Sequence, residues 1–337
     1  MSWSAFDTFT DPDAYHAAIS SAYARSRSDG VVTARGNFRA DFARIQLDRV
    51  LLRHARETLP RTAYSAMDPR QFLIAFTTDP RQQIYVSGLE LVPDAIVVFR
   101  AASEGYNRYS ASRWSGIALP HEDVAAAGQT LIGRELIAPP NTHVIKPPRP
   151  FFSKLLKLDK AVRHLAKAAP EVLASAEVAR ALDQAVTRVM IQCLSEGQGI
   201  EKVGSAHWRH AAVMRRLENF LEANPDRTLH MTDLCAAAAA SDRTLRILCH
   251  EHLGMSPTRY LWLRRMHLAR RALRMADPTT TTVTEIATSY AFWELGRFAV
   301  AYRSLFGETP SATLGRPPED PRRQNVFGSP WRLPESA

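Results

Sequence analysis

Several side chains near the C-terminal end of the chain are suited to reading base edges in DNA. Arg243 and Arg246 alternate with leucines, and helical periodicity turns the arginines outward while the leucines face a core. An arginine can bind the O6 and N7 atoms of one guanine through two hydrogen bonds. We predict that both arginines contact bases, with Ser241 and Thr244 beside them. The alternative is that the arginines bind only phosphate, which fixes a protein on DNA without reading its sequence.

A second group of candidates follows about fifty residues later. Trp293, Glu294 and Arg297 are predicted to face outward near the start of a helix, with neighbouring aromatic residues facing inward. Glu294 can accept a hydrogen bond from cytosine N4, Arg297 can bind guanine or phosphate, and Trp293 can pack on a thymine methyl group or cover the domain surface. Gly296 is unexpected early in a helix. It allows either close approach of the DNA backbone or close packing within the protein.

The first group must be positioned by two short helices joined by a tight turn. Their predicted ranges are 231–238 and 242–251, and Ser241 caps the second helix by accepting from backbone N–H groups of its first turn. The second group belongs to a similar unit. Thr282 and Glu285 have the spacing of a capping box, and after a turn at 290–292 a second helix runs from about 294 to 305. The chain therefore carries two helix-turn-helix units.

The two units end alike and are joined by one helix. Leu253-Gly-Met-Ser-Pro257 is mirrored by Phe306-Gly-Glu-Thr-Pro310, in which glycine ends one helix and Ser-Pro or Thr-Pro begins the next. The connector from Pro257 to Ala276 alternates apolar residues with arginines, and this local arrangement of charge, together with that on the second helices, points to DNA. About 19 helical residues span roughly 28 Å, close to the repeat of B-DNA of roughly 34 Å. The connector can therefore hold two readers over successive major grooves.

These motifs resemble the DNA-binding domain of AraC/XylS-type transcription regulators over the last third of the chain. The resemblance rests on the segments Gly254-Met-Ser-Pro-Thr-Arg-Tyr-Leu261, Ile286-Ala287, Ala291-Phe-Trp-Glu-Leu-Gly-Arg-Phe298 and Phe306-Gly-Glu-Thr-Pro-Ser311. One departure is alanine at 239 and 291, where the family has glycine. Alanine in a left-handed turn costs on the order of 1 kcal/mol, so we expect slightly altered turns.

The resemblance implies a one-component regulator. Its expected parts are a cupin-like N-terminal domain that binds a small-molecule effector, a helical pair that dimerises, and a domain that binds double-stranded DNA and activates transcription by contacting RNA polymerase. The alternative for the helical pair is that its apolar stripes pack only on the chain's own barrel. Residues Tyr85, Tyr106, Tyr109, Arg113 and Trp114 are open as pocket residues, core or surface, and the effector is unknown.

The rest of the chain predicts an α+β fold. Residues 1–30 show helical spacing, whereas 31–144 contain short apolar or alternating runs separated by Pro, Gly and Asp, which favours a sandwich or barrel. We predict a β-rich regulatory domain at 1–150, the helical pair at 151–195, a linker at 196–206, the DNA-binding domain at 207–315 and a disordered tail at 316–337.

Composition favours a cytoplasmic protein. The net charge of +9 suits a polyanionic partner but identifies none, and three cysteines without metal-type spacing indicate buried thiols. No apolar stretch is long enough for a membrane span, and no signal peptide is apparent.

Signals for catalysis are poor, because the sequence has no phosphate-binding glycine loop and no nucleophile elbow. We expect no catalytic residue, no metal site and no cofactor. His121-Glu-Asp123 is interpreted as a helix N-terminus with favourable acidic residues. Two other functions stay open: a cupin-type enzyme fused to a DNA-binding domain, and a regulator controlled by a protein partner without a ligand.

Overall fold

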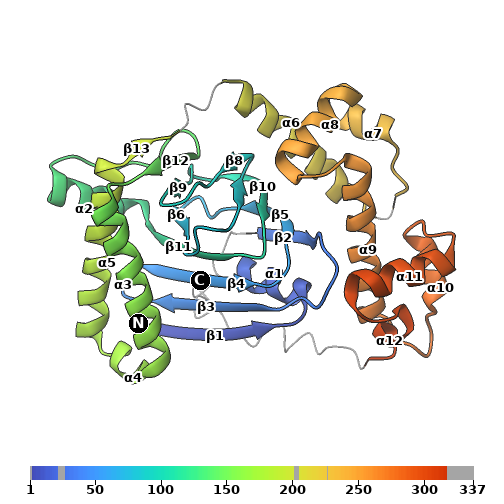
Figure 1. Ribbon diagram of the computed structural model, residues 1–337, viewed down its shortest axis with the longest axis horizontal. Helices are drawn as coiled ribbons and strands as arrows, with labels where there is room; N and C mark the ends of the chain where they lie inside the picture. Colours follow the sequence, from blue (N-terminus) through green and yellow to red (C-terminus); the bar gives the residue numbers. More distant parts are fainter. Residues whose placement is uncertain (1, 22–26, 201–204, 226, 317–337) are drawn as a thin grey trace, which may run out of the picture.

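Two antiparallel sheets and two groups of helices build the described part of the chain (Figure 1). The computed structural model describes residues 2–21, 27–200, 205–225 and 227–316. The predicted disordered tail lies outside the described residues except for Arg316, as do residues 201–204 of the predicted linker. Within the described part, no helix is both long and apolar enough to cross a membrane.

The larger sheet has the strand order β1-β3-β4-β11-β6-β9-β12-β13 and the smaller sheet β2-β5-β10-β7-β8. The strands of the larger sheet are β1 (Trp3–Phe9), β3 (Ala40–Gln46), β4 (Leu51–Glu57), β6 (Gln71–Thr77), β9 (Ile96–Val98), β11 (Arg113–Pro120), β12 (His143–Lys146) and β13 (Gln198–Gly199). Those of the smaller sheet are β2 (Arg27–Val32), β5 (Arg61–Ala66), β7 (Ile84–Val86), β8 (Leu89–Glu90) and β10 (Glu104–Tyr109). The β-rich, α+β prediction is confirmed.

Helices cover the outer faces of this sandwich. Those associated with the sheets are α1 (Pro12–Ser20), α2 (His121–Ile132), α3 (Arg149–Ala168), α4 (Pro170–Leu173) and α5 (Ala176–Glu196). The C-terminal helices are α6 (Ser205–Ala223), α7 (Met231–Ala238), α8 (Asp242–Leu253), α9 (Pro257–Met275), α10 (Val283–Ser289), α11 (Leu295–Phe306) and α12 (Pro310–Leu314). In Figure 1 the helices α3 and α5 lie on one side of the sheets and α6 to α12 on the other.

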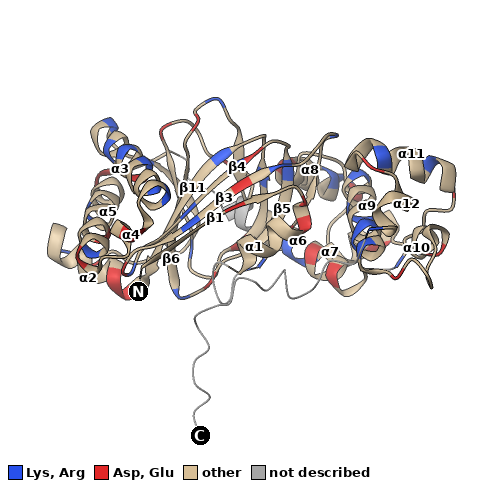
Figure 2. Cartoon of the chain, turned by 90° about the horizontal axis from the view of Figure 1, so that it is seen from below, with Lys and Arg blue, Asp and Glu red and all other residues tan. Residues whose placement is uncertain are grey.

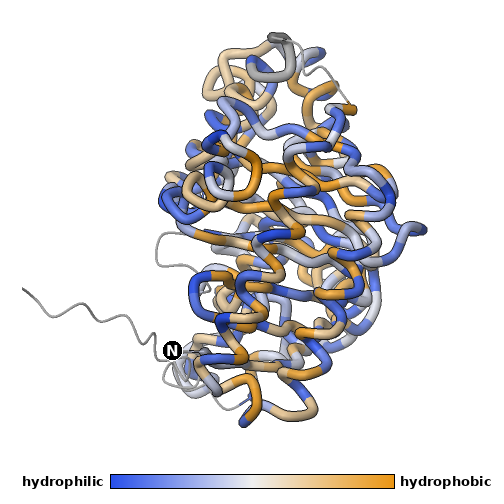
Figure 3. The backbone as a smooth tube through the Cα atoms, turned by 90° about the vertical axis from the view of Figure 1, so that its left-hand side faces the viewer, coloured by the Kyte–Doolittle hydropathy of each residue, from blue (hydrophilic) through white to orange (hydrophobic). Residues whose placement is uncertain are grey.

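Three apolar clusters hold these layers together. One lies between the sheets and includes Phe42 and Trp114, and a second joins the larger sheet to α2, α3 and α5. The third is the core of the C-terminal helices, and it also contains Val31, Tyr64 and Tyr106 of the smaller sheet. Polar and apolar residues alternate along the chain accordingly (Figure 3). The sandwich and the C-terminal helices therefore share a continuous core.

The prediction of a helical segment over residues 1–30 is only partly right. Helix α1 exists and is capped by Asp11, but strands β1 and β2 flank it. Strand β1 pairs along its full length with β3, from Trp3 opposite Gln46 to Phe9 opposite Ala40. This long-range pairing outweighs the local helical spacing, which a short segment alone does not resolve.

Strand β5 was not recognised from the sequence because several of its buried positions are polar. Strand β5 buries Arg61, and the charge is compensated by Glu57, whose carboxylate accepts from Arg61 Nε at 2.6 Å and from Arg61 Nη2 at 3.0 Å. Tyr15 and Trp114 donate to the same carboxylate at 2.6 and 2.8 Å. A buried charge with this many partners is tolerated, although its residue type predicts exposure.

Both turns of the helix-turn-helix units contain alanine in the left-handed conformation, as predicted. The φ angles are 50° at Ala239 and 59° at Ala291. The thiols of Cys193 and Cys249 are buried, Cys235 is half-buried, and all three are unpaired.

We predict that Ala239→Gly or Ala291→Gly raises the free energy of unfolding by about 1 kcal/mol, because glycine adopts a positive φ without a Cβ clash. Chemical denaturation measures the change. Ala299→Gly, within helix α11, is the matched control and should lower stability by a similar amount. Equal effects at all three positions would contradict the explanation by backbone strain.

A buried polar group attaches α3 to the larger sheet. Asp159 Oδ2 accepts from Ser115 Oγ at 3.2 Å, and Ser115 Oγ lies 2.8 Å from His54 Nδ1. Burial raises the pKa of Asp159 to about 7, against the nearby charge of Arg163. Burial, followed by the charge of Arg163, lowers the pKa of His54 to about 3. Both groups are therefore held toward their neutral forms.

Asp159→Asn should stabilise the protein above pH 7 by on the order of 4 kcal/mol. The carboxyl has a higher pKa folded than unfolded, so the wild type loses stability as pH rises from about 4 to about 7. The amide does not ionise, so the advantage of the variant should vanish below pH 4. Denaturation at pH 4, 6 and 8 tests this. A difference that is constant with pH would show that only a hydrogen bond has changed.

Candidate nucleic-acid interface

The first candidate reading helix, α8, begins as predicted. Ser241 Oγ accepts from the backbone N–H of Thr244 at 3.2 Å and lies 2.8 Å from Thr244 Oγ1. Leu245 and Leu248 are buried, whereas Arg243 is exposed on the opposite face. Among the described residues, no carboxylate forms an ion pair with Arg243. Its guanidinium is available for a ligand outside the chain.

Arg246 lies on the side of α8 and is held by its own helix. It forms an ion pair with Asp242 one turn earlier, in which Nη2 lies 3.2 Å from Oδ2. The hydrogen bond with Asp242 raises the pKa of Arg246. Sequence spacing alone ranked the two arginines equally. Within the described residues, the structure pairs Arg246 with Asp242 and gives Arg243 no carboxylate partner.

The second candidate helix, α11, begins one residue later than predicted, at Leu295. Glu294 occupies the cap position without a side-chain cap, and its carboxylate instead pairs with Arg297 Nη1 at 2.9 Å. Trp293 precedes the helix and is 73% exposed. Glu294, Arg297 and Trp293 therefore lie together on the surface, as the sequence predicted.

A packing reason for Gly296 is excluded within the described residues. A Cβ atom added there would have no heavy atom within 4 Å. Because the protein itself does not require the missing side chain, the outer face of α11 is simply open at this position.

The repeated glycine at the end of each unit shows which positions of the two reading helices correspond to one another. Both helices are 12 residues long and end at a left-handed glycine, with φ of 72° at Gly254 and 78° at Gly307. Seven residues before each glycine stands an exposed aliphatic residue: Ile247, 54% exposed, and Val300, 73% exposed. Sequence analysis did not select either residue, although counting back from the repeated Gly would have found both.

The connector helix α9 begins at Pro257 as predicted and ends at Met275, one residue before the predicted end. Ser256 Oγ accepts from the backbone N–H of Arg259 at 3.3 Å and caps the helix. Its arginines, however, do not all face outward. Arginines are concentrated on α9, but several of them meet acidic side chains of the sandwich (Figure 2). The expectation that the connector's charge pattern points to DNA is wrong for these arginines in this structure.

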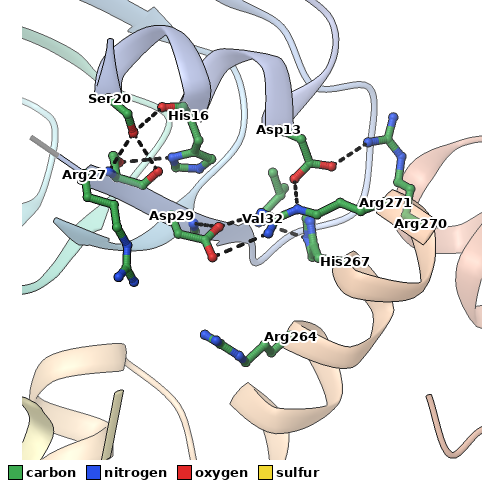
Figure 4. Close-up of polar contacts among 12 residues, drawn as sticks. Asp13, His16, Ser20, Arg27, Asp29, Val32, Arg264, His267, Arg270 and Arg271 are labelled. Atoms are coloured by element: carbon green, nitrogen blue, oxygen red, sulfur yellow. Dashed lines mark hydrogen bonds and ion pairs between the residues drawn. The ribbon is translucent and has the colours of Figure 1, made fainter. Parts of the chain in front are cut away.

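Two arginines of α9 meet carboxylates of α1 and β2 (Figure 4). Arg271 Nε lies 2.6 Å from Asp13 Oδ1, and Arg271 Nη2 lies 2.5 Å from Asp29 Oδ1. Arg270 pairs with Asp11 and lies 3.5 Å from Asp13. Burial opposes ionisation of Asp29, but hydrogen bonds and charge from Arg271 outweigh it and lower the pKa of that carboxyl. We call these five residues the acid–arginine cluster.

A buried histidine lies next to the acid–arginine cluster. The Nε2 atom of His267 accepts from the backbone N–H of Val32 at 3.2 Å. Burial, followed by the charges of Arg271 and Arg270, lowers the pKa of His267 to about 3. The ring is therefore neutral and fixes the connector to the backbone of β2.

A single buried carboxylate joins α6, α9 and the smaller sheet. Glu218 is fully buried, accepts from Tyr106 and lies 3.0 Å from Arg264 Nη1. Tyr106 also packs edge-on against Tyr64 and Tyr260, with ring centroids 5.2 and 5.6 Å apart. Three elements therefore satisfy one charge that none of them could bury alone.

Side chains of the sandwich also approach both repeated glycines. A Cβ atom at Gly254 would lie 2.6 Å from Arg108 Nη1, and one at Gly307 would lie 2.8 Å from Asn37 Oδ1. Thr62 of β5 donates to the carbonyl of Leu253 at 3.2 Å. Both reading units thus contact the sandwich at their ends.

A cavity of about 50 Å³ lies between the two sheets. Arg53 and Trp114 of the larger sheet and Arg61 and Tyr109 of the smaller sheet line it with mostly aliphatic neighbours. Of the five residues left open by the sequence, only Tyr109 and Trp114 line this cavity. Tyr106 belongs to the junction with α6, Tyr85 packs against Arg108 and Arg113 is exposed.

The remaining polar motif has a structural explanation. His121 to Asp123 form the first turn of α2, and Asp123 accepts from Arg49 Nε at 2.9 Å. The described residues contain no group of three metal-ligating side chains close enough to hold an ion.

Comparisons with known proteins agree with this geometry at the C-terminal end. A family model described as a Helix-turn-helix domain matches residues 234–316. The chain is 40% identical over 101 residues to the XylDLEGF operon transcriptional activator 2 of Pseudomonas putida, covering 29% of this chain and 63% of that protein. It is 33% identical over 146 residues to a probable thc operon regulatory protein of Rhodococcus erythropolis, covering 40% and 43%. The aligned part therefore spans less than two thirds of these relatives.

Among solved structures, the AraC-like transcriptional activator CuxR aligns with 79% of this chain and 95% of its own, with a TM-score of 0.42 and 12% identity.

Glu218→Gln should lower the free energy of unfolding by about 3 kcal/mol, because it leaves the nearly buried guanidinium of Arg264 without its counter-charge. Chemical denaturation measures the loss. The control is Arg39→Gln, which removes an exposed pair with Asp41 and should cost at most about 1 kcal/mol. Equal losses from the two variants would show that the junction at Glu218 is not a stabilising contact.

Proposed function

Because the chain carries an AraC/XylS-type DNA-binding domain, we propose that it is a sequence-specific transcription regulator that places α8 and α11 in successive major grooves. The observation that carries this proposal is the pair of equivalent, solvent-exposed helices joined by the 19-residue helix α9. Activation of transcription through contact with RNA polymerase is part of the proposal, since relatives are named as activators. We propose no catalytic role, no cofactor and a cytoplasmic location.

In this proposal, Arg243 reads a base and Thr244 and Ser241 lie beside it at the start of α8. An unpaired, exposed arginine is suited to bidentate contact with guanine. Arg246 would bind phosphate or support the helix, because Asp242 already occupies its guanidinium. At α11, Glu294 and Arg297 neutralise each other and must separate before either can bind a base, while Trp293 is already exposed.

The cavity between the sheets is the proposed effector site. Its volume of about 50 Å³ admits only a few water molecules, whereas sites for small molecules are roughly 300 Å³ or larger. An effector must therefore part the sheets. Its mostly aliphatic and aromatic lining favours a compact, mainly apolar molecule.

The junction with the C-terminal helices is the proposed route of regulation. Arg27 lines the cavity and also donates to Glu222 of α6 at 2.8 Å. Movement of β2 by an effector would therefore reach α6 directly, and the acid–arginine cluster would carry it to α9. A ligand changes this equilibrium only as far as it binds one arrangement better than the other.

We keep the domain division predicted from the sequence as part of the proposal. We also propose that the chain forms a homodimer through α3 and α5. The apolar stripes of both helices are largely used in packing on the larger sheet. The shared outer groove is lined by Lys154, Lys157 and Arg188, so a symmetric contact there brings like charges together. Sedimentation at low and high salt measures the oligomeric state.

Two alternative functions predict different results with the full chain. Control by a protein partner predicts that no small molecule raises its melting temperature, whereas an effector should do so. A cupin-type enzyme predicts turnover of a small molecule. No observation on the sandwich favours either alternative over effector binding.

The direct test is a footprint on DNA selected from a random library, followed by affinity measurements. Arg243→Ala should lower affinity for the selected site by about 1–3 kcal/mol and affinity for random DNA much less. Arg246→Ala, the matched control, should lower both affinities by similar, smaller amounts. Absence of any preferred sequence argues against the proposed function. If Arg243→Ala lowers affinity for the selected site and for random DNA equally, Arg243 is a phosphate contact.

Releasing the arginines of α9 should strengthen non-specific DNA binding. We expect the double variant Asp13→Asn/Asp29→Asn to bind random DNA more tightly, with a salt dependence steeper by up to about one unit of slope per arginine released. The charge-matched control is Asp48→Asn/Glu135→Gln, at two exposed positions outside the acid–arginine cluster. Equal gains from both pairs would show a general charge effect without release of α9.

A further inference from the structure

Ile247 and Val300 occupy equivalent places at the centre of the exposed faces of the two reading helices. In α8 the buried residues include Leu245, Leu248 and Cys249, and at 100° per residue Ile247 points directly away from them. In α11 the buried residues are Phe298, Tyr302 and Leu305, and Val300 points away from these in the same manner.

Neither side chain contributes to the protein's own core. More than half of each is exposed, and β-branched residues are not favoured in helices for their own sake. One exposed aliphatic residue on a surface is ordinary. Two at the same position of a duplicated unit, each at the middle of an otherwise polar or open face, indicate a shared contact outside the chain.

The neighbours of these residues favour a polyanion as that partner. Arg243 and His250 lie one turn before and about one turn after Ile247, and both are exposed. Around Val300 the corresponding residues are Gly296 and Arg303, with Gly296 leaving the face open. Glu251, one turn after Ile247, is half-buried and lies 3.2 Å from His210 Nδ1, so the exposed ionisable residues within one turn of the two aliphatic side chains are basic.

We propose that Ile247 and Val300 each read the methyl group of a thymine, in two half-sites one helical turn apart. This inference rests on the proposed function. The thymine methyl is the apolar group on base edges in the major groove, and an aliphatic side chain has neither donor nor acceptor with which to read any other feature. The two residues are thus specificity determinants of the same chemical class.

The geometry also gives the expected pattern of bases. Four helical residues from Arg243 to Ile247 advance roughly 6 Å, or about two base steps of 3.4 Å. The first half-site should therefore have a guanine and a thymine within about two base pairs of one another. The second half-site should have a thymine without the matching guanine, because Gly296 replaces the arginine.

The experiment uses the full chain and its preferred duplex, selected from a random library. Each thymine is replaced in turn by deoxyuridine, which removes only the methyl group. We expect about fourfold weaker binding, the value of one buried methyl group, at one thymine in each half-site, with the two sites roughly ten base pairs apart.

Variants assign each thymine to its reader. Ile247→Ala should abolish the difference between thymine and uracil at one half-site only, and Val300→Ala at the other only. Met275→Ala, which removes a 65% exposed apolar side chain from the end of α9, is the control and should leave both differences intact.

The outcomes separate this inference from the proposed function. Sequence-specific binding that is unchanged by uracil at every position overturns the methyl contacts but leaves the regulator intact. A uracil effect that persists in both alanine variants also overturns the methyl contacts. If the alanine variants bind DNA unchanged but no longer activate transcription, the two residues contact a protein partner, and the methyl contacts are overturned as well. Absence of any preferred sequence overturns both proposals.

Discussion

The buried carboxylate of Glu218 determines how the reading domain is joined to the sandwich. It belongs to α6, yet its partners are Tyr106 of the smaller sheet and Arg264 of α9. A charge removed from water is costly unless hydrogen bonds and a counter-charge replace the water. The first helix of the C-terminal domain, the connector and β10 must therefore come together, and the shared apolar core around Val31 and Tyr64 follows from this approach.

This junction divides the positive charge of the C-terminal domain into two sets. Arg270 and Arg271 are neutralised by carboxylates of the sandwich and hold the connector against it, whereas Arg264 is neutralised by Glu218 of α6. Arg243 remains without a carboxylate partner among the described residues and faces solvent. The net charge of the chain therefore overstates the positive charge available to a polyanion. Which arginine can bind a polyanion depends on whether a carboxylate of the chain already neutralises it.

Local signals account for what the sequence predicted well. The caps at Ser241, Ser256 and Thr282 depend on side chains within three residues of the N–H groups they satisfy, so helix starts were found within one or two residues. The faces of α9 could not be assigned in this way. Arg271 meets Asp29 across 242 residues of sequence, and a helical pattern of arginines looks the same whether solvent, phosphate or a carboxylate faces it.

The same limit explains the errors in the sandwich. Strand β5 contains an arginine that is buried because Glu57 lies beside it, and the residue type by itself predicts an exposed position. For a related reason, the sequence led to the polar residues of the candidate DNA interface and not to its aliphatic ones. Polar side chains on a predicted helix suggest chemistry, whereas Ile247 and Val300 resemble core residues until the structure shows which face is buried.

The two reading units differ at the first turns of their reading helices. The first has a side-chain cap at Ser241, and its last carbonyl, at Leu253, accepts from Thr62 of the sandwich. The second begins at Glu294 without a side-chain cap, and its outer face lacks a side chain at Gly296. A helix fixed at both ends can place a hydrogen-bonding arginine accurately, which bidentate recognition requires. The open face of α11 instead suits contacts that depend on shape and apolar surface, so the duplicated fold supports two different modes of reading.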